Sequence, residues 1–237
     1  MAFESVARTH VGCRRKINED AILSRPDLGV WAVADGMGGH DAGEVASAMI
    51  VKNLTERASD LDFAAATGAA RDAIEAANGQ LVAMAAGGER PRTIGATVVV
   101  LVADGAAFAC LWVGDSRAYR ARGRALVQIS RDHSLVQELV DLGELNPADA
   151  ASHPNANVVT RAVGAAGAVS IDVVKGEIAP GDIFLLASDG LTRLVSSEEL
   201  LAGLQSHDLS EAADQLVATC LERGAPDNVS LVIVRAG

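Results

Sequence analysis

The order of short apolar segments and longer helical segments constrains the fold of this chain more than any other sequence feature. Ten short runs, many rich in valine, isoleucine and leucine, are bounded by glycine, aspartate or proline, as β-strands are. They cover residues 3–9, 20–24, 29–34, 94–103, 106–113, 117–121, 125–129, 169–178, 182–187 and 229–235. Strands and helices do not alternate one by one. We therefore expect an α+β fold of antiparallel sheets covered by helices, not a doubly wound parallel sheet.

Two longer blocks, at about residues 42–86 and 196–223, have helical character. In the first block, Asp41 followed by Glu44 resembles a capping box, so a helix is expected to begin at residue 42. Apolar side chains then recur at three- and four-residue steps, which predicts a second helix. This stripe consists of Ala70, Ile74, Ala77, Leu81 and Ala85. A similar stripe from Leu209 to Leu221 predicts a helix in the second block.

Residues 131–160 interrupt the series of strands. Ser134 and Gln137 are placed to cap a short helix that ends near Gly143. Pro147 and Pro154 then interrupt the chain. We expect a surface insertion here, within a single domain that covers residues 1–237.

Charge and composition exclude several classes of function. The net charge of −11 argues against non-specific binding to nucleic acid or to anionic lipid. No uninterrupted apolar run approaches 18 residues, and the first ten residues contain no apolar signal region, so no membrane association is expected. The three cysteines are widely spaced, which suits a reducing compartment. We expect a cytoplasmic monomer.

Aspartates stand at the ends of several predicted strands. Asp35, Asp104, Asp115 and Asp189 each follow an apolar strand, and Asp227 precedes one. Aspartate followed by glycine is also a common turn signal. For Asp104, which lies between two strands, a hairpin turn is the preferred interpretation. Asp35 and Asp189 instead lead toward helices, which a simple turn does not explain.

Carboxylates that meet at strand ends would repel one another. Two unit charges 4 Å apart cost about 4 kcal/mol at an effective dielectric constant of about 20, so such a cluster needs cations. Oxygen ligands alone favour Mg²⁺ or Mn²⁺, and no cysteine or histidine spacing suggests zinc. The stretch VADGMGGH, residues 33–40, fits a metal site because Gly36 lets a backbone carbonyl approach an ion closely.

The segment VGCRRKINED, residues 11–20, offers further ligands. Glu19 and Asp20 add carboxylates, and an arginine would supply a planar cation suited to phosphate. A solvated run of charges is the alternative for this segment. Cys13 is interpreted as a small packing residue and not as a nucleophile, because no loop of backbone donors follows it.

Eight short motifs occur in the order of one known family. They read GCRRKINEDA, VADGMGGHDAGEVAS, GATVVVLV, WVGDSRAYR, RDHS, TRAVG, LLASDGL and DNVSLVIV. With these motifs the sequence resembles the metal-dependent protein phosphatases, the type 2C serine/threonine phosphatases, in their compact bacterial form. The resemblance extends from about residue 8 to residue 235. It implies a four-layer α-β-β-α sandwich of two antiparallel sheets flanked by helix pairs, with metals at one end.

The resemblance also implies a set of ligands for two Mn²⁺ or Mg²⁺ ions. Asp35 would bridge the two ions. Asp189 and Asp227 would complete the first site, and Glu19 with the carbonyl of Gly36 would complete the second.

Further residues match the family motifs. Asp20 would hold a metal-bound water, and Arg15 would bind the phosphate. Bacterial members often bind a third metal between residues that match Asp115 and Asp189. The alternative for Asp115 is a hydrogen-bonding residue of a turn.

The implied activity is hydrolysis of phosphoserine and phosphothreonine in proteins by a metal-activated water, which reverses a serine/threonine kinase. Met37 stands where many eukaryotic relatives have a histidine that acts as the leaving-group acid. His40 is a candidate for that role, and a histidine packed at the start of a helix is the alternative. The insertion at residues 131–160 matches the variable flap of the family and is expected to influence the choice of phosphoprotein. A catalytically silent phosphoprotein-binding module and a phosphatase of small phosphoesters remain alternative functions.

Overall fold

All ten predicted strands form in the computed structural model, which describes residues 2–38, 42–87 and 94–237. Their ends lie within three residues of the predicted ends. The strands are β1 (Phe3–His10), β2 (Asp20–Arg25), β3 (Val30–Met37), β4 (Gly95–Asp104), β5 (Ala107–Val113), β6 (Arg117–Arg122), β7 (Ala125–Gln128), β8 (Asp172–Glu177), β9 (Ile183–Ala187) and β10 (Val229–Ala236). They make two antiparallel sheets, with the orders β1-β10-β9-β6-β7 and β2-β3-β4-β5-β8.

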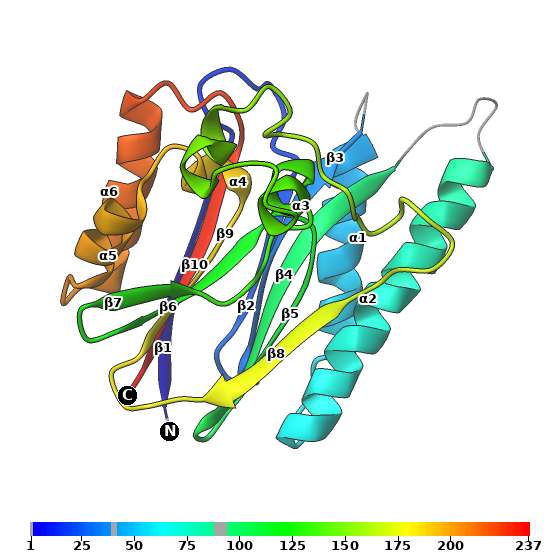
Figure 1. Cartoon of the computed structure of the whole chain (residues 1–237). Helices are drawn as coiled ribbons and strands as arrows, with labels where there is room; N and C mark the ends of the chain where they lie inside the picture. The colour runs from blue at the N-terminus through cyan, green and yellow to red at the C-terminus, as the bar shows by residue number, and fades with distance from the viewer. Residues whose placement is uncertain (1, 39–41, 88–93) are drawn as a thin grey trace.

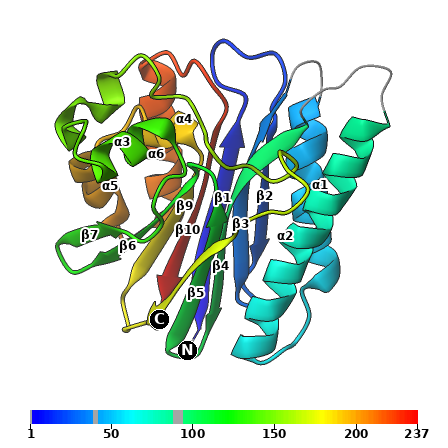
Figure 2. The same ribbon diagram turned by 45° about the vertical axis from the view of Figure 1, so that its right-hand side comes forward.

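Helices cover the outer face of each sheet. The helical elements are α1 (Ala42–Arg57), α2 (Phe63–Ala86), α3 (Leu135–Asp141), a 3₁₀ turn η1 (Pro147–Ser152), α4 (Asp189–Thr192), α5 (Ser197–Leu204) and α6 (Leu209–Glu222). Helices α1 and α2 lie against the β2–β8 sheet, and α5 and α6 lie against the other sheet (Figures 1 and 2). The α+β fold with four α-β-β-α layers is therefore confirmed. None of the helices in the described ranges combines the length and apolar character that a membrane span requires.

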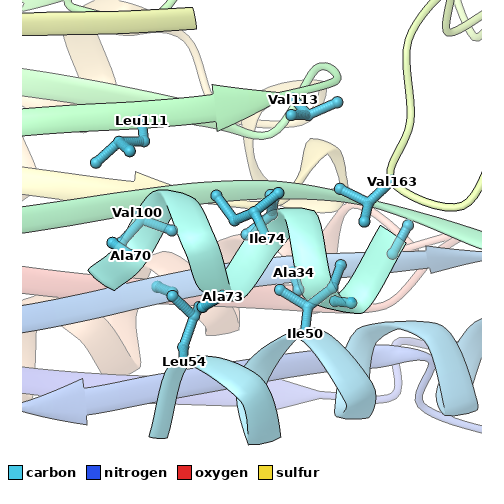
Figure 3. Packing of buried hydrophobic residues seen from close by; sticks show 14 of the residues in the cluster. Ala34, Ile50, Leu54, Ala70, Ala73, Ile74, Val100, Leu111, Val113 and Val163 are labelled. Carbon is cyan, nitrogen blue, oxygen red and sulfur yellow. The ribbon is translucent and has the colours of Figure 1, made fainter. Parts of the chain in front are cut away.

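Small aliphatic side chains fill the layer between α1, α2 and their sheet (Figure 3). Ile50 and Leu54 of α1 and Ala73 and Ile74 of α2 are buried there, facing strand residues such as Val100. Alanines on the buried stripe of α2 leave room for close packing of the helix on the strands. Since only 3 % of the residues are aromatic, aliphatic packing accounts for most of this layer.

The few aromatic residues gather mainly between the two sheets. Both tryptophans, Trp31 and Trp112, lie in this inner layer with Phe108 and Phe184, and Phe3 packs against it. The rings of Phe108 and Phe184 lie 5.1 Å apart, and those of Phe3 and Trp31 lie 5.5 Å apart edge to face. Such pairs stabilise a packed layer beyond the area they bury. The inner layer therefore holds the two sheets in a fixed relation.

Side-chain caps begin most of the helices. Ser134 caps α3, as predicted, and its hydroxyl accepts from the Gln137 N–H. Asp62 caps α2 in the same way, and Ser196 with Glu199 forms a capping box for α5. The predicted cap at Asp41 lies outside the described residues.

Three local features differ from the predictions. Strand β3 does not end at Asp35 but continues to Met37, because its last residues pair with the start of β4. The turn of the β4–β5 hairpin consists of Gly105 and Ala106, with Asp104 still paired to Ala107. The short elements η1 and α4 were not predicted. Residues 131–160 contain α3 and η1 and lie between β7 and β8.

Candidate active site

The candidate site lies where the ends of both sheets meet. Asp20 starts β2 and pairs with Asp35 near the end of β3. Asp189 follows β9 at the start of α4, and Asp227 lies two residues before β10. These segments come from different sheets but share one end of the sandwich, opposite the chain ends at Phe3 and Ala236.

A cleft of about 350 Å³ opens at this end. It is lined by Arg15, Glu19, Asp35, Gly36, Met37, Gly38, Thr97, Asp115, Asn157, Val159, Asp189, Arg193 and Asp227. Seven of the nine predicted site residues are in this lining. Asp20 is not, although its carboxylate lies behind the cleft and accepts a hydrogen bond of 2.9 Å from the Ser188 hydroxyl. His40 lies outside the described residues.

Two arginines lie among the carboxylates of the cleft. Arg15 Nη2 is 2.7 Å from Asp227 Oδ2, and Arg15 Nη1 is 3.9 Å from Glu19 Oε2. Arg193 Nη2 is 2.8 Å from Asp189 Oδ2 and 3.5 Å from Asp115 Oδ2. In the described ranges, no three acidic, histidine or cysteine side chains already form a closed metal cage. The carboxylates instead line an open cleft, together with the guanidinium groups of Arg15 and Arg193.

The cleft carboxylates are costly to ionise together. Burial raises the pKa of Asp35 well above its usual range, and the nearby charges of Asp20 and Asp189 raise it further. Burial also raises the pKa of Asp115 to about 7. For Asp20, burial raises the pKa to about 7 although hydrogen bonds from Ser230 and Ser188 oppose the shift. Cations would remove this cost, and an oxygen-only donor set suits Mg²⁺ or Mn²⁺.

Gly36 permits a very close approach of three backbone segments. A Cβ atom at Gly36 would lie 2.1 Å from the Gly43 carbonyl oxygen and 2.6 Å from that of Glu19. The Gly36 N–H also donates to the Glu19 carbonyl at 3.1 Å. The first turn of α1, the end of β3 and the loop before β2 therefore meet without an intervening side chain. Such a close approach suits a metal site in which a backbone carbonyl oxygen, here that of Gly36, is one of the ligands.

Asn228 fixes the loop that carries Arg15 and Glu19. Its Oδ1 accepts from the Glu19 N–H at 2.8 Å, and its Nδ2 donates to the carbonyls of Val11 and Ile17 at 2.9 and 3.0 Å. The side chain is buried, so these contacts are shielded from water. This asparagine belongs to the motif DNVSLVIV, but no role was predicted for it.

Six lining residues were not among the nine predicted site residues. Two of them, Met37 and Gly38, belong to the stretch VADGMGGH that was expected at the metal site, and the other four were not expected there. Thr97, Asn157 and Val159 carry no local signal, because tertiary structure alone brings them to the cleft. Arg193 had a signal, since it stands four residues after Asp189, the spacing at which charges meet on a helix.

The prediction that Cys13 is a packing residue is wrong. This cysteine is exposed, and its thiol donates only a long contact of 3.6 Å to the Leu221 carbonyl. It is also absent from the cleft lining, which agrees with its exclusion as a nucleophile.

Comparisons with known proteins agree with this geometry. Residues 13–230 match the family model described as protein phosphatase 2C. The chain is 35 % identical over 233 residues to the serine/threonine protein phosphatase PstP of Mycobacterium tuberculosis. That match covers 98 % of this chain but 45 % of the relative, so the chain spans about half the length of this curated protein.

Solved structures resemble the chain over nearly its whole length. PppA, described as a key regulatory component of T6SS in Pseudomonas aeruginosa, has a TM-score of 0.91 and 42 % identity, with 100 % of this chain and 99 % of that chain covered. The catalytic domain of PstP in complex with two manganese ions has a TM-score of 0.87 and 33 % identity, with coverages of 98 % and 97 %. From the family match and these relatives, we conclude that the chain belongs to the protein phosphatase 2C family.

Proposed function

We propose that this chain hydrolyses phosphoserine and phosphothreonine residues of proteins with the help of two Mn²⁺ or Mg²⁺ ions. The observation that carries the proposal is the cleft in which acidic side chains from both sheets meet two arginines. Family membership supports the reaction, as do relatives named serine/threonine phosphatases and the PstP structure with two manganese ions.

The ligands proposed for the ions are those that line the cleft. Asp35, which lines the cleft and pairs with Asp20 across β2 and β3, would be shared between both ions. Asp189 and Asp227 would hold one ion, and Glu19 with the Gly36 carbonyl would hold the other. When bound, the ions supply positive charge for the phosphoryl oxygens and activate the attacking water.

The side chains of this chain perform the remaining steps. Arg15 binds the phosphate dianion through its planar guanidinium group. To do so, it gives up its contact with Asp227. Asp20, held by the Ser188 hydroxyl, orients the attacking water from behind the cleft. Asp115 and Asp189 would offer carboxylates to a third cation. His40 is kept as the candidate that protonates the leaving alkoxide.

We infer that residues 1–237 act as one catalytic domain and as a monomer. Residues 131–160 form its substrate-facing flap, because Asn157 and Val159 from this segment line the cleft. A serine/threonine kinase would supply the substrate, because such a kinase produces the phosphoserine and phosphothreonine residues that the proposed reaction hydrolyses. The unpaired cysteines favour the cytoplasm, where thiols stay reduced.

Release of phosphate from phosphoserine and phosphothreonine peptides tests the proposal, with Mn²⁺ or Mg²⁺ added and after chelation. We expect activity only with the metals. Asp35→Asn should remove nearly all of it, whereas Asp104→Asn, also at a strand end but outside the cleft lining, should not.

The other outcomes favour other functions. Activity that survives exhaustive chelation would contradict the metal mechanism. Faster turnover of small phosphoesters than of every peptide would favour a small-molecule phosphatase. Binding of phosphopeptides without any release would indicate a silent binding module.

A further inference from the structure

Residues 141–160, on one rim of the cleft, contain no buried side chain. Packing therefore contributes little to holding this stretch in place. Yet Asn157 and Val159 belong to it and line the cleft beside the carboxylates. The position of this rim depends on its polar contacts.

Backbone hydrogen bonds close the two ends of the segment onto each other. The Thr160 N–H donates to the His133 carbonyl at 2.8 Å, and the Leu135 N–H donates to the Val158 carbonyl at 2.9 Å. The His133 N–H donates to the Gly114 carbonyl at 2.9 Å, which ties this stem to the end of β5. The chain between these ends is left as a loop with mostly internal contacts.

Arg193, directly after α4, connects this loop to the rest of the cleft. Its guanidinium donates to the side-chain oxygen of Asn157 and also contacts Asp189 and Asp115. Within the described ranges, this is the only hydrogen bond or ion pair that joins residues 142–157 to any residue outside 131–160. A single side chain thus links the rim to two carboxylates of the site.

We propose that Arg193 is a positioning residue that holds Asn157 at the rim and thereby sets how a phosphoprotein enters the cleft. The planar guanidinium has five donors in a fixed geometry, so it can serve two carboxylates and an amide at once. A protein substrate would contact this rim, whereas a small aryl phosphate would reach the carboxylates without touching it. The substrate consequence rests on the proposed phosphatase function, but the contact itself does not.

Limited proteolysis of the free protein tests the contact. A glutamate-specific protease has Glu144 as a site in the loop. Asn157→Ala removes the loop side of the contact and keeps the arginine beside its carboxylates. We expect cleavage at Glu144 to become about three to ten times faster, the effect of losing one exposed, charge-assisted hydrogen bond. Arg193→Gln combined with Asn157→Ala should add little to that increase, because both changes break one link.

Arg131→Gln is the matched control. It removes the contact between Arg131 and Asp141, which lies within the same segment and leaves the link to the cleft intact. Cleavage at Glu144 should change less than about twofold. The proposal would be overturned if Asn157→Ala were cleaved at Glu144 at the wild-type rate, or if the effects of the two changes added in the double variant. Either result would count whether or not the protein is a phosphatase.

Kinetics test the consequence for substrates. Asn157→Ala should raise KM for a phosphothreonine peptide by about three- to tenfold, while kcat/KM for an aryl phosphate stays within about twofold of wild type. Faster proteolysis with an unchanged peptide KM would refute the role in substrate entry. If the wild type hydrolyses neither substrate, the proposed function is wrong, and the proteolysis still decides whether Arg193 holds the rim.

Discussion

Replacement of Gly36 by alanine perturbs the point where β3, α1 and the Glu19 loop meet. The new Cβ would lie 2.1 Å from the Gly43 carbonyl oxygen and 2.6 Å from that of Glu19. Both neighbours are backbone atoms, so no flexible side chain can move aside. The segments would have to separate by more than about 1 Å to restore ordinary contact distances.

Forced insertion of one carbon into a packed site usually destabilises a protein by about 1–3 kcal/mol. For a chain of 237 residues, that corresponds to a decrease in Tm of about 2–6 °C. The displacement also moves the Gly36 carbonyl and Glu19 apart. We therefore expect weaker Mn²⁺ binding by calorimetry together with the lower Tm.

Gly68→Ala is the control for this experiment. Gly68 lies inside α2, and a Cβ there would meet nothing within 4 Å. Alanine is favoured over glycine in a helix by about 0.5–1 kcal/mol, so this variant should be slightly more stable than wild type. If Gly36→Ala kept the wild-type Tm and Mn²⁺ affinity, the inferred close backbone approach would be wrong.

Three further predictions concern the site and its surroundings. Arg15→Ala should raise KM for phosphopeptides more than it lowers kcat, because a phosphate contact is made in both the ground state and the transition state; a loss in kcat alone would contradict this. Without divalent cations, Tm should fall as the pH rises from about 4 to about 8. The pKa values of Asp20 and Asp115 are raised to about 7 in the fold, so their stabilising effect is complete below the unfolded pKa of about 3.9 and is lost as the pH passes 7. Added Mn²⁺ should reverse that fall, and a Tm that rises over this range would refute the charge cluster. Cys13→Ser should retain turnover in a phosphopeptide assay, and its inactivation would return the thiol to consideration.

Local signals in the sequence were sufficient to predict the strands, because each is an aliphatic run closed by glycine, aspartate or proline. Ser134 could also be identified as a helix cap from local sequence, because its hydroxyl accepts from the N–H of Gln137, only three residues away. The aspartates at strand ends could be grouped because the motifs follow a family order. That these aspartates meet in one cleft depends on how the two sheets pack and on how their strands pair. No local sequence pattern encodes either arrangement.

Other features depended on contacts between distant segments. Strand β3 continues through Gly36 because β4 offers it partners, although glycine in isolation favours a turn. Asn157 and Val159 reach the cleft through the stem at Ser134, which lies far from them in sequence. Cys13 was predicted to pack, but the loop that carries it faces solvent.

The gathering of aromatic rings between the sheets gives this protein a selective optical reporter. Trp31 and Trp112 are the only tryptophans in the sequence, and both lie in the layer that joins the two halves of the cleft. Intrinsic fluorescence should therefore follow the separation of the sheets, while far-ultraviolet circular dichroism is dominated by the outer helices. Coincident unfolding curves from the two signals would mean that the layers separate in one cooperative step. An earlier fluorescence change would show that the halves of the cleft part while the helices remain folded.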